Sequence, residues 1–262
     1  MLEGHSPRPS PETRFAVKRG KHAVSAQHAP RQNHLLAALP PEDYERLLPA
    51  LKPVPLSLGW TVHGAGAREK HLYFLTAGIV CRFYVMETGA SAGYAVTGSE
   101  GVIGIASFLG GISTPSQAVV LSAGYAYRLG ADLAQAEFER HSRLAVLLLR
   151  YTQALMAETG QAAACNRYHS LEQQLCRWLL SCRDRLHSGE LTITHELIAE
   201  MLGVRREGIT LAAGKLQEAG LIDHRRGHIA VLDRRRLEAR ACECYEAVKK
   251  EYGRLLPDKI AG

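Results

Sequence analysis

The sequence predicts an α+β protein with an N-terminal β-roll, one long helix and a C-terminal winged helix-turn-helix. Three observations predict this order. Short strand-like runs broken by glycines come first, a proline-free stretch with an apolar stripe follows, and two short helical patterns joined at Gly203 come last. At 262 residues and 46% hydrophobic composition, the chain is long enough for two domains. We expect a disordered tail over 1–30, the β-roll over 31–130, a dimerisation helix over 131–162 and the winged helix-turn-helix over 163–262.

The region before the long helix has the pattern of a small β domain. Asn33 to Leu51 is rich in leucine and is broken by Pro40 and Pro41, which predicts a pair of short helices. Six runs rich in β-branched and aromatic residues then predict the strands of a barrel or roll. These runs are Leu58–Val62, His71–Leu75, Ile79–Met86, Ala92–Thr97, Val119–Leu121 and Tyr125–Leu129.

The stretch from Asp132 to Thr159 predicts one helix of about 28 residues with an apolar stripe. A second copy of the same helix could cover this stripe, because a two-fold dimer makes it self-complementary. The alternative is that the stripe packs on the chain's own β-roll. We expect a homodimer whose interface consists of Leu144, Leu147, Leu148, Tyr151 and Leu155.

Residues 193–216 predict a helix-turn-helix. Thr194 is a candidate N-cap for a helix over His195–Leu202, and Gly203 suits a sharp turn with positive φ. In the second helix, one side carries the apolar residues Ile209, Ala212, Ala213 and Leu216. The opposite side carries Arg205, Arg206, Glu207 and Thr210, which we expect to read DNA bases. Arginine can bond guanine and glutamate can accept from cytosine in the major groove, although such a pair is also common on a solvated helix face.

A β-hairpin wing is predicted after this helix, between Leu221 and Leu232, with a basic tip. Phosphate contacts fix the position of a protein on DNA without reading its sequence. We expect such contacts from the residues at the start of the first helix and at the wing tip, which are Thr194, His195, Arg225, Arg226 and His228.

Charge and composition agree with a nucleic-acid partner. The chain has 32 Lys+Arg against 26 Asp+Glu, for a formal net charge of +6. We expect double-stranded DNA carrying an inverted repeat as the partner of a two-fold dimer, with RNA polymerase as a further candidate. No segment has the length and hydropathy of a membrane span or a signal peptide, so we expect a cytoplasmic protein whose six cysteines are free thiols.

The order of these parts resembles the Crp/Fnr family of bacterial transcription regulators, over about Asn33 to Asp233. The family pattern I-T-x-x-x-I-A-x-x-x-G-x-x-R-E is matched by Ile193, Thr194, Ile198, Ala199, Gly203, Arg206 and Glu207. The resemblance implies a cyclic-nucleotide-binding-like β-roll and base reading by Arg206 and Glu207. Two positions depart from the pattern: Leu211 replaces a base-reading arginine, and Arg205 replaces a serine or threonine cap.

The sensor departs further from the family members that bind cyclic nucleotides. Those members hold the ribose with a glutamate and the phosphate with an Arg-Ser/Thr-Ala segment, whereas Val102 and Ser116, Gln117 and Ala118 stand at these positions here. A buried phosphate without the arginine would lose charge-assisted hydrogen bonds. We expect an effector other than a cyclic nucleotide; a cAMP- or cGMP-responsive regulator is an alternative.

No cofactor or metal is expected, and no enzyme motif is complete. Cys242-Glu243-Cys244 lacks a second pair of ligands, and Cys176 and Cys182 fit the core of a helix. His195-Glu196 is not followed by the second histidine of a zinc protease, because Ala199 stands there. The alternative to a DNA-binding regulator is a small-molecule-binding regulatory module that acts through protein contacts.

Overall fold

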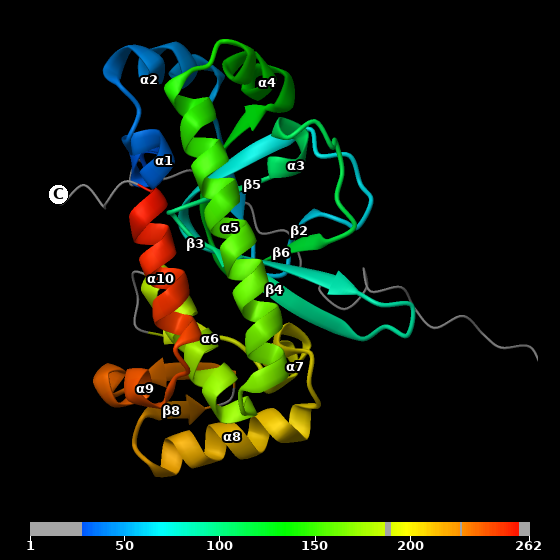
Figure 1. The fold of residues 1–262 in the computed structure, drawn as a ribbon, viewed down its shortest axis with the longest axis vertical. Helices are drawn as coiled ribbons and strands as arrows, with labels where there is room; N and C mark the ends of the chain where they lie inside the picture. The colour runs from blue at the N-terminus through cyan, green and yellow to red at the C-terminus, as the bar shows by residue number, and fades with distance from the viewer. Residues whose placement is uncertain (1–27, 187–189, 226, 257–262) are drawn as a thin grey trace, which may run out of the picture.

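The computed structural model describes residues 28–186, 190–225 and 227–256. The tail expected over 1–30 lies outside the described residues except for 28–30, and Arg226 lies outside them too. The predicted α+β class and the order of the parts are confirmed (Figure 1).

Within the described residues, the N-terminal part is built on a six-stranded antiparallel sheet. Its main strands follow the order β1-β6-β3-β4, while β2 pairs with β6 and β5 pairs with β3. The strands are β1 (Lys52–Leu56), β2 (Thr61–His63), β3 (His71–Val85), β4 (Ser91–Thr97), β5 (Val102–Ile103) and β6 (Gln117–Gly130). The short helical elements are η2 (Pro30–Gln32), α1 (His34–Ala37), α2 (Pro41–Leu47), η3 (Leu48–Ala50) and α3 (Ile105–Phe108).

Two strands are longer than predicted, because each continues through a glycine that lies between two predicted runs. β3 and β6 pair along most of their length, with shifts of register between Leu75 and Val80. Gly78 has a φ of +86°, and a Cβ on Gly124 would collide with the Ala77 carbonyl group. These glycines let the two strands bend without ending, so β3 covers two of the six predicted runs and β6 covers two others, Val119–Leu121 and Tyr125–Leu129.

The long helix is interrupted, which corrects the prediction of one helix over Asp132–Thr159. The chain forms α4 (Ala131–Glu139) and then α5 (Arg143–Tyr168). Between them His141 has a positive φ of 52°, and the Ser142 side chain caps α5 by accepting from the backbone N–H of Ala145. The second helix therefore begins later and ends later than expected.

The stripe predicted as a dimer interface faces inward, which corrects that prediction. Leu144, Leu147, Leu148 and Tyr151 have 0% exposure and Leu155 has 9%, all within the single chain. They join a core with leucines of α1, α2 and the adjoining strands. Side chains that are already buried in their own chain cannot form a surface for a second copy.

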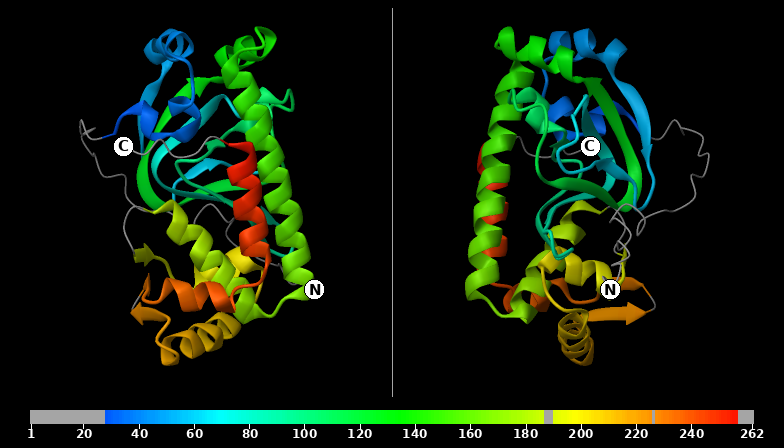
Figure 2. Two further views of the ribbon diagram at one scale, coloured as in Figure 1. Left: turned by 60° about the vertical axis from the view of Figure 1, so that its left-hand side comes forward. Right: turned by 90° about the vertical axis from the view of Figure 1, so that its right-hand side faces the viewer.

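The C-terminal part contains the predicted helix-turn-helix and wing. Its helices are α6 (Leu171–Arg185), α7 (His195–Leu202), α8 (Arg206–Glu218), α9 (Arg234–Arg240) and α10 (Cys244–Leu255). Its strands β7 (Glu190–Thr192), β8 (Ile222–Arg225) and β9 (His228–Val231) form a sheet in the order β7-β9-β8. α10 returns along α5, so that the end of the described chain lies beside the long helix (Figure 2).

The edge strands β1 and β7 are not among the strands predicted from the sequence. β1 carries Pro53 and Pro55, which argue against a strand, but it lies at an edge of the sheet, where a missing N–H is tolerated. β7 is only three residues long and is a strand because it pairs with the wing strand β9.

The β-roll and the helix-turn-helix share one hydrophobic core. Ile79, Cys81 and Phe83 of β3 pack in the same cluster as buried residues of α6, α7 and α8. α7 lies on β4, and the Ser91 hydroxyl donates to the carbonyl oxygen of Glu200 over 3.3 Å. The two parts are therefore packed as one unit in this structure.

Candidate DNA-binding surface

The helix-turn-helix has the local features that the sequence predicts. The Thr194 hydroxyl accepts from the backbone N–H of Leu197 over 3.2 Å and caps α7. Gly203 ends α7 with a φ of +67°, where an L side chain would be strained. Because the cap and the turn are fixed, α8 begins at a defined angle to α7.

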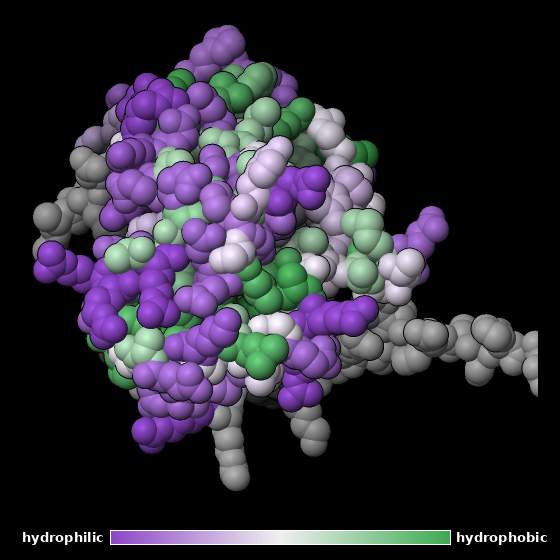
Figure 3. Space-filling model, turned by 60° about the horizontal axis from the view of Figure 1, so that its bottom comes forward, coloured by the Kyte–Doolittle hydropathy of each residue, from purple (hydrophilic) through white to green (hydrophobic). Residues whose placement is uncertain are grey.

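α8 has one buried and one exposed side. Ile209, Ala212, Ala213 and Leu216 are buried in the shared core. The four side chains predicted to read bases, Arg205, Arg206, Glu207 and Thr210, are all exposed on the first turns of the helix. This end of the molecule is largely hydrophilic, with a few hydrophobic patches (Figure 3).

Glu196 of α7 and Leu211 of α8 adjoin these exposed side chains. Arg206 Nε lies 3.9 Å from Glu196 Oε2, and both side chains are more than half exposed, so this pair leaves the guanidinium available. Leu211, at the family's arginine position, is 71% exposed. An exposed leucine beside these polar groups can contact a thymine methyl group but cannot bond guanine.

Among the residues predicted to contact phosphate, His195 has a different environment from the rest. Its ring stacks on that of His224 at 4.0 Å, and its Nδ1 lies 3.1 Å from the hydroxyl of Thr210. Burial, then the neighbouring His224 and Arg206 charges, lower the pKa of His195, so the ring is neutral at pH 7. The ring thus links α7, α8 and the wing, and His224 is a contributor that sequence reasoning missed.

The remaining predicted phosphate contacts are at the edge of this surface. Thr194 is exposed, but its hydroxyl is used as the cap of α7. Arg225 is exposed and lies 3.0 Å from the carboxylate of Asp223, and His228 is exposed with Nδ1 3.4 Å from the Thr192 hydroxyl. The structure therefore leaves Arg225 and His228 accessible beside α8.

A buried charge network joins this domain to the β-roll. Arg185, in the last turn of α6, donates from Nε to Glu100 over 2.6 Å, and its Nη2 lies 3.8 Å from Glu158 of α5. Tyr252 of α10 donates to Glu158 over 2.6 Å. Next to the network is a cavity of about 350 Å³, lined by residues of α1, the β4–β5 turn, α6 and α10. Sequence analysis could not find this network because its members come from four separate segments.

The interior of the β-roll holds a buried arginine that sequence analysis did not single out. Arg82 of β3 donates to the Thr97 hydroxyl, the Val102 carbonyl oxygen and the Tyr151 hydroxyl. Ser116 is fully buried and bonded to Tyr94 at 2.9 Å. The hydroxyls of Ser116 and Thr114 are 3.1 Å apart, so this part of the interior is joined by hydrogen bonds between side chains.

The described residues form a β-roll, a long helix and a winged helix-turn-helix, and the helix α8 begins with exposed basic and acidic side chains. Residues 173–240 match the family described as the Crp-like helix-turn-helix domain. No curated protein sequence matches the chain. Residues 173–240 are therefore similar to this domain family, and the solved structures described below share the fold of the chain.

Solved structures show the same fold at low sequence identity. A Crp/Fnr-family transcriptional regulator from Eubacterium rectale has a TM-score of 0.64 and 19% identity, covering 80% of this chain and 98% of that one. FixK2 from Bradyrhizobium japonicum has a TM-score of 0.62 and 16% identity, covering 73% and 98%. A CRP-family regulator from Thermus thermophilus has a TM-score of 0.59 and 22% identity, covering 72% and 96%. None of the helices in the described part of the chain is long and apolar enough to cross a membrane.

Proposed function

We propose that the chain is a Crp/Fnr-type transcription regulator that binds DNA sequence-specifically, with Arg206 and Glu207 of α8 reading bases in the major groove. The observation that carries the proposal is the exposure of both side chains at the start of a helix whose opposite side is buried. Arg205 and Thr210 flank them and complete the surface that faces bases, while Leu211 replaces an arginine contact with an apolar one. Thr194, Arg225, Arg226 and His228 are assigned to phosphate positioning, and His195 to supporting Thr210.

We further propose that the regulator is a homodimer formed by the outer side of α5. The exposed positions at 146, 149, 153, 156 and 160 alternate in steps of three and four, which is the spacing of a coiled-coil seam. Val146, Leu149 and Met156 are 37%, 46% and 69% exposed, so this seam offers apolar side chains to a partner. A second copy fits it best, because two-fold symmetry places the same heptad on both sides and puts Gln153 opposite its counterpart.

A two-fold dimer gives the operator its expected form. Two recognition helices related by two-fold symmetry enter successive major grooves about 34 Å apart, so the operator is an inverted repeat. Under this proposal the β-roll receives a signal other than a cyclic nucleotide, because Val102 and Ser116 stand where the nucleotide-binding members have a glutamate and an arginine.

The test is selection of bound fragments from the genome of the source organism. Purified full-length protein is expected to enrich fragments that share an inverted repeat with half-sites about 10 base pairs apart, centre to centre. The Arg206→Ala variant should enrich a motif that has lost one position in each half-site. Enrichment of unrelated fragments by the wild type, or a motif unchanged by Arg206→Ala, would contradict the assignment. Binding that shows no dependence on salt would favour the alternative of a module acting through protein contacts.

A further inference from the structure

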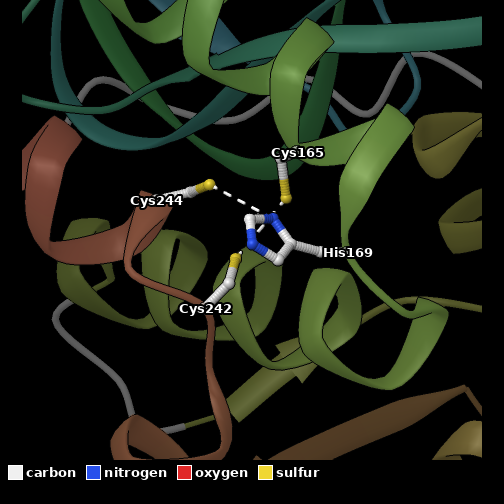
Figure 4. A group of neighbouring side chains, drawn as sticks. All are labelled: Cys165, His169, Cys242 and Cys244. Atoms are coloured by element: carbon white, nitrogen blue, oxygen red, sulfur yellow. Dashed lines mark hydrogen bonds between the residues drawn. The ribbon is translucent and has the colours of Figure 1, made fainter.

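Four potential metal ligands meet where the long helix ends. Cys165 lies in the last turn of α5 and His169 follows directly after it. Cys242 precedes α10 and Cys244 is its first residue. The ligand atoms of these four residues all lie within 4.8 Å of one another, and Figure 4 shows the three thiols and the imidazole turned toward a common centre.

Two of the separations are close to those of a tetrahedral site for one ion. Cys165 Sγ lies 3.5 Å from Cys242 Sγ, and Cys244 Sγ lies 3.5 Å from His169 Nδ1. With Zn–S bonds of about 2.3 Å and Zn–N of about 2.0 Å, tetrahedral zinc holds sulfurs about 3.8 Å apart and nitrogen about 3.5 Å from sulfur. An iron–sulfur cluster spreads its ligands over several irons, so four ligand atoms this close fit a single ion better.

The other cysteines of the chain provide an internal comparison. Cys81, Cys176 and Cys182 are buried in the large core shared by the β-roll and the helix-turn-helix, where cysteine acts as a small apolar residue. Cys165, Cys242 and Cys244 are equally buried, but they form a separate cluster of their own. Three thiols gathered outside the apolar cores are better explained as ligands than as packing residues.

Neighbouring side chains supply the second shell that a metal-binding histidine and thiolates need. His169 Nε2 lies 3.2 Å from the carboxylate of Glu243, which would fix the ring with Nδ1 toward the metal. Gln161 donates to Cys244 Sγ over 3.0 Å, as an amide does to a thiolate. Arg177 is buried, and its guanidinium charge acts on the thiol of Cys165. Its positive charge would balance the net negative charge of zinc with three thiolates and one histidine.

We propose that Cys165, His169, Cys242 and Cys244 bind one structural Zn²⁺ that fastens α10 to the end of α5. All four positions are filled by protein, which is typical of structural rather than catalytic zinc. The expectation that Cys242 and Cys244 lack a second pair of ligands is thereby revised, because α5 brings the pair from 77 residues away.

The direct test is the metal content of the purified full-length protein. Elemental analysis is expected to find about one zinc per chain, reduced at least tenfold in Cys165→Ser and in Cys244→Ser. Cys176→Ser is the matched control and should keep its zinc, because it changes a buried cysteine of the large core. Equal zinc in Cys244→Ser and the wild type, or one equivalent of iron or copper in place of zinc, would overturn the proposal.

A second measurement does not depend on how the variants fold. Adding Co²⁺ to metal-free wild-type protein should give the visible bands of tetrahedral cobalt and a thiolate charge-transfer band, both abolished by one equivalent of Zn²⁺. A strong chelator should lower the melting temperature of the wild type by at least about 5 °C. No cobalt spectrum from fully reduced protein, or a stable Cys165–Cys242 disulfide in freshly purified protein, would contradict the zinc site. Neither outcome bears on DNA recognition, which is read from α8.

Discussion

Arg185 Nε lies 2.6 Å from Oε1 of Glu100, and this single contact joins the last turn of α6 to the turn between β4 and β5. Both side chains are largely buried, at 11% and 17% exposure. Because Glu158 of α5 lies beside the same guanidinium, the contact links the β-roll, the long helix and the DNA-binding domain. Any displacement of the β4–β5 turn would therefore act directly on α6.

The first prediction concerns stability and pH. Burial alone would raise the pKa of Glu100, but the Arg185 guanidinium outweighs it and the pKa lies below its ordinary value. The ion pair therefore stabilises the folded state fully above the ordinary carboxylate pKa of 4.5, and this stability is lost as pH falls through the lower folded value. At pH 7, Glu100→Gln should lower the free energy of unfolding by about 3 kcal/mol, because Arg185 loses its closest partner.

Urea unfolding at several pH values measures this effect. The difference between wild type and Glu100→Gln should be constant near neutrality and should shrink below about pH 4. Glu87→Gln, at an exposed carboxylate, is the control and should change stability by less than about 0.5 kcal/mol. If the difference in free energy of unfolding between wild type and Glu100→Gln stays the same down to pH 3, the Glu100 carboxylate is not the charged partner of Arg185.

The second prediction separates base reading from phosphate contact. Arg206→Ala should weaken binding to the operator by about 1–3 kcal/mol and remove the preference at one base pair in each half-site. Arg225→Ala should weaken operator and random duplexes alike and should reduce the dependence of affinity on salt. Fluorescence anisotropy with both duplexes measures these effects. Lys250→Ala, which removes an exposed charge from α10, is the control for the change in net charge. If Arg206→Ala weakens binding to both duplexes equally, Arg206 does not read bases.

The third prediction uses the exposed leucine of the recognition helix. Leu211→Arg should leave the fold intact, since the side chain is already in solvent, and should add a preference for guanine at one operator position. Selection of bound sequences from a random library would reveal the new preference. Leu211→Lys is the comparison, because lysine raises the general affinity for DNA without the planar bidentate group. An identical motif from both variants would mean that position 211 does not face the bases.

The fourth prediction concerns the assembly. Replacing Leu149 and Met156 by glutamate should convert a dimer into a folded monomer, because both side chains lie on the exposed seam of α5. Leu148→Ala is the matched comparison: it should cost about 2–5 kcal/mol of stability and leave the dimer in place, since Leu148 is fully buried in its own chain. Sedimentation velocity at micromolar concentration distinguishes the species. A monomeric wild type, or a dimer that survives both glutamates, would exclude this seam.

The helix-turn-helix was predictable from the sequence because its determinants are local. A cap at Thr194, a glycine that accepts positive φ at Gly203 and an apolar repeat in each helix lie within about two dozen residues. The observed bounds of α7 are those expected. The wing also follows from short-range alternation, apart from the pairing with β7.

The features that could not be predicted depend on distant partners. Helical periodicity predicts one apolar stripe on α5, but only the packing of α1, α2 and the β-roll decides that this stripe is buried within its own chain. The bulges at Gly78 and Gly124 require pairing between β3 and β6, and the glycines by themselves suggest turns. The cysteine and histidine cluster joins two short segments far apart in the chain, so neither segment has a recognisable metal signature alone.

The most direct measurement is the affinity of the wild-type protein for a selected operator and for a scrambled duplex of the same length, over a series of salt concentrations. The operator should bind at least about 10³-fold more tightly at physiological salt, and the affinity for both duplexes should fall steeply as salt rises. Equal affinity for the two duplexes at every salt concentration would contradict base recognition by α8.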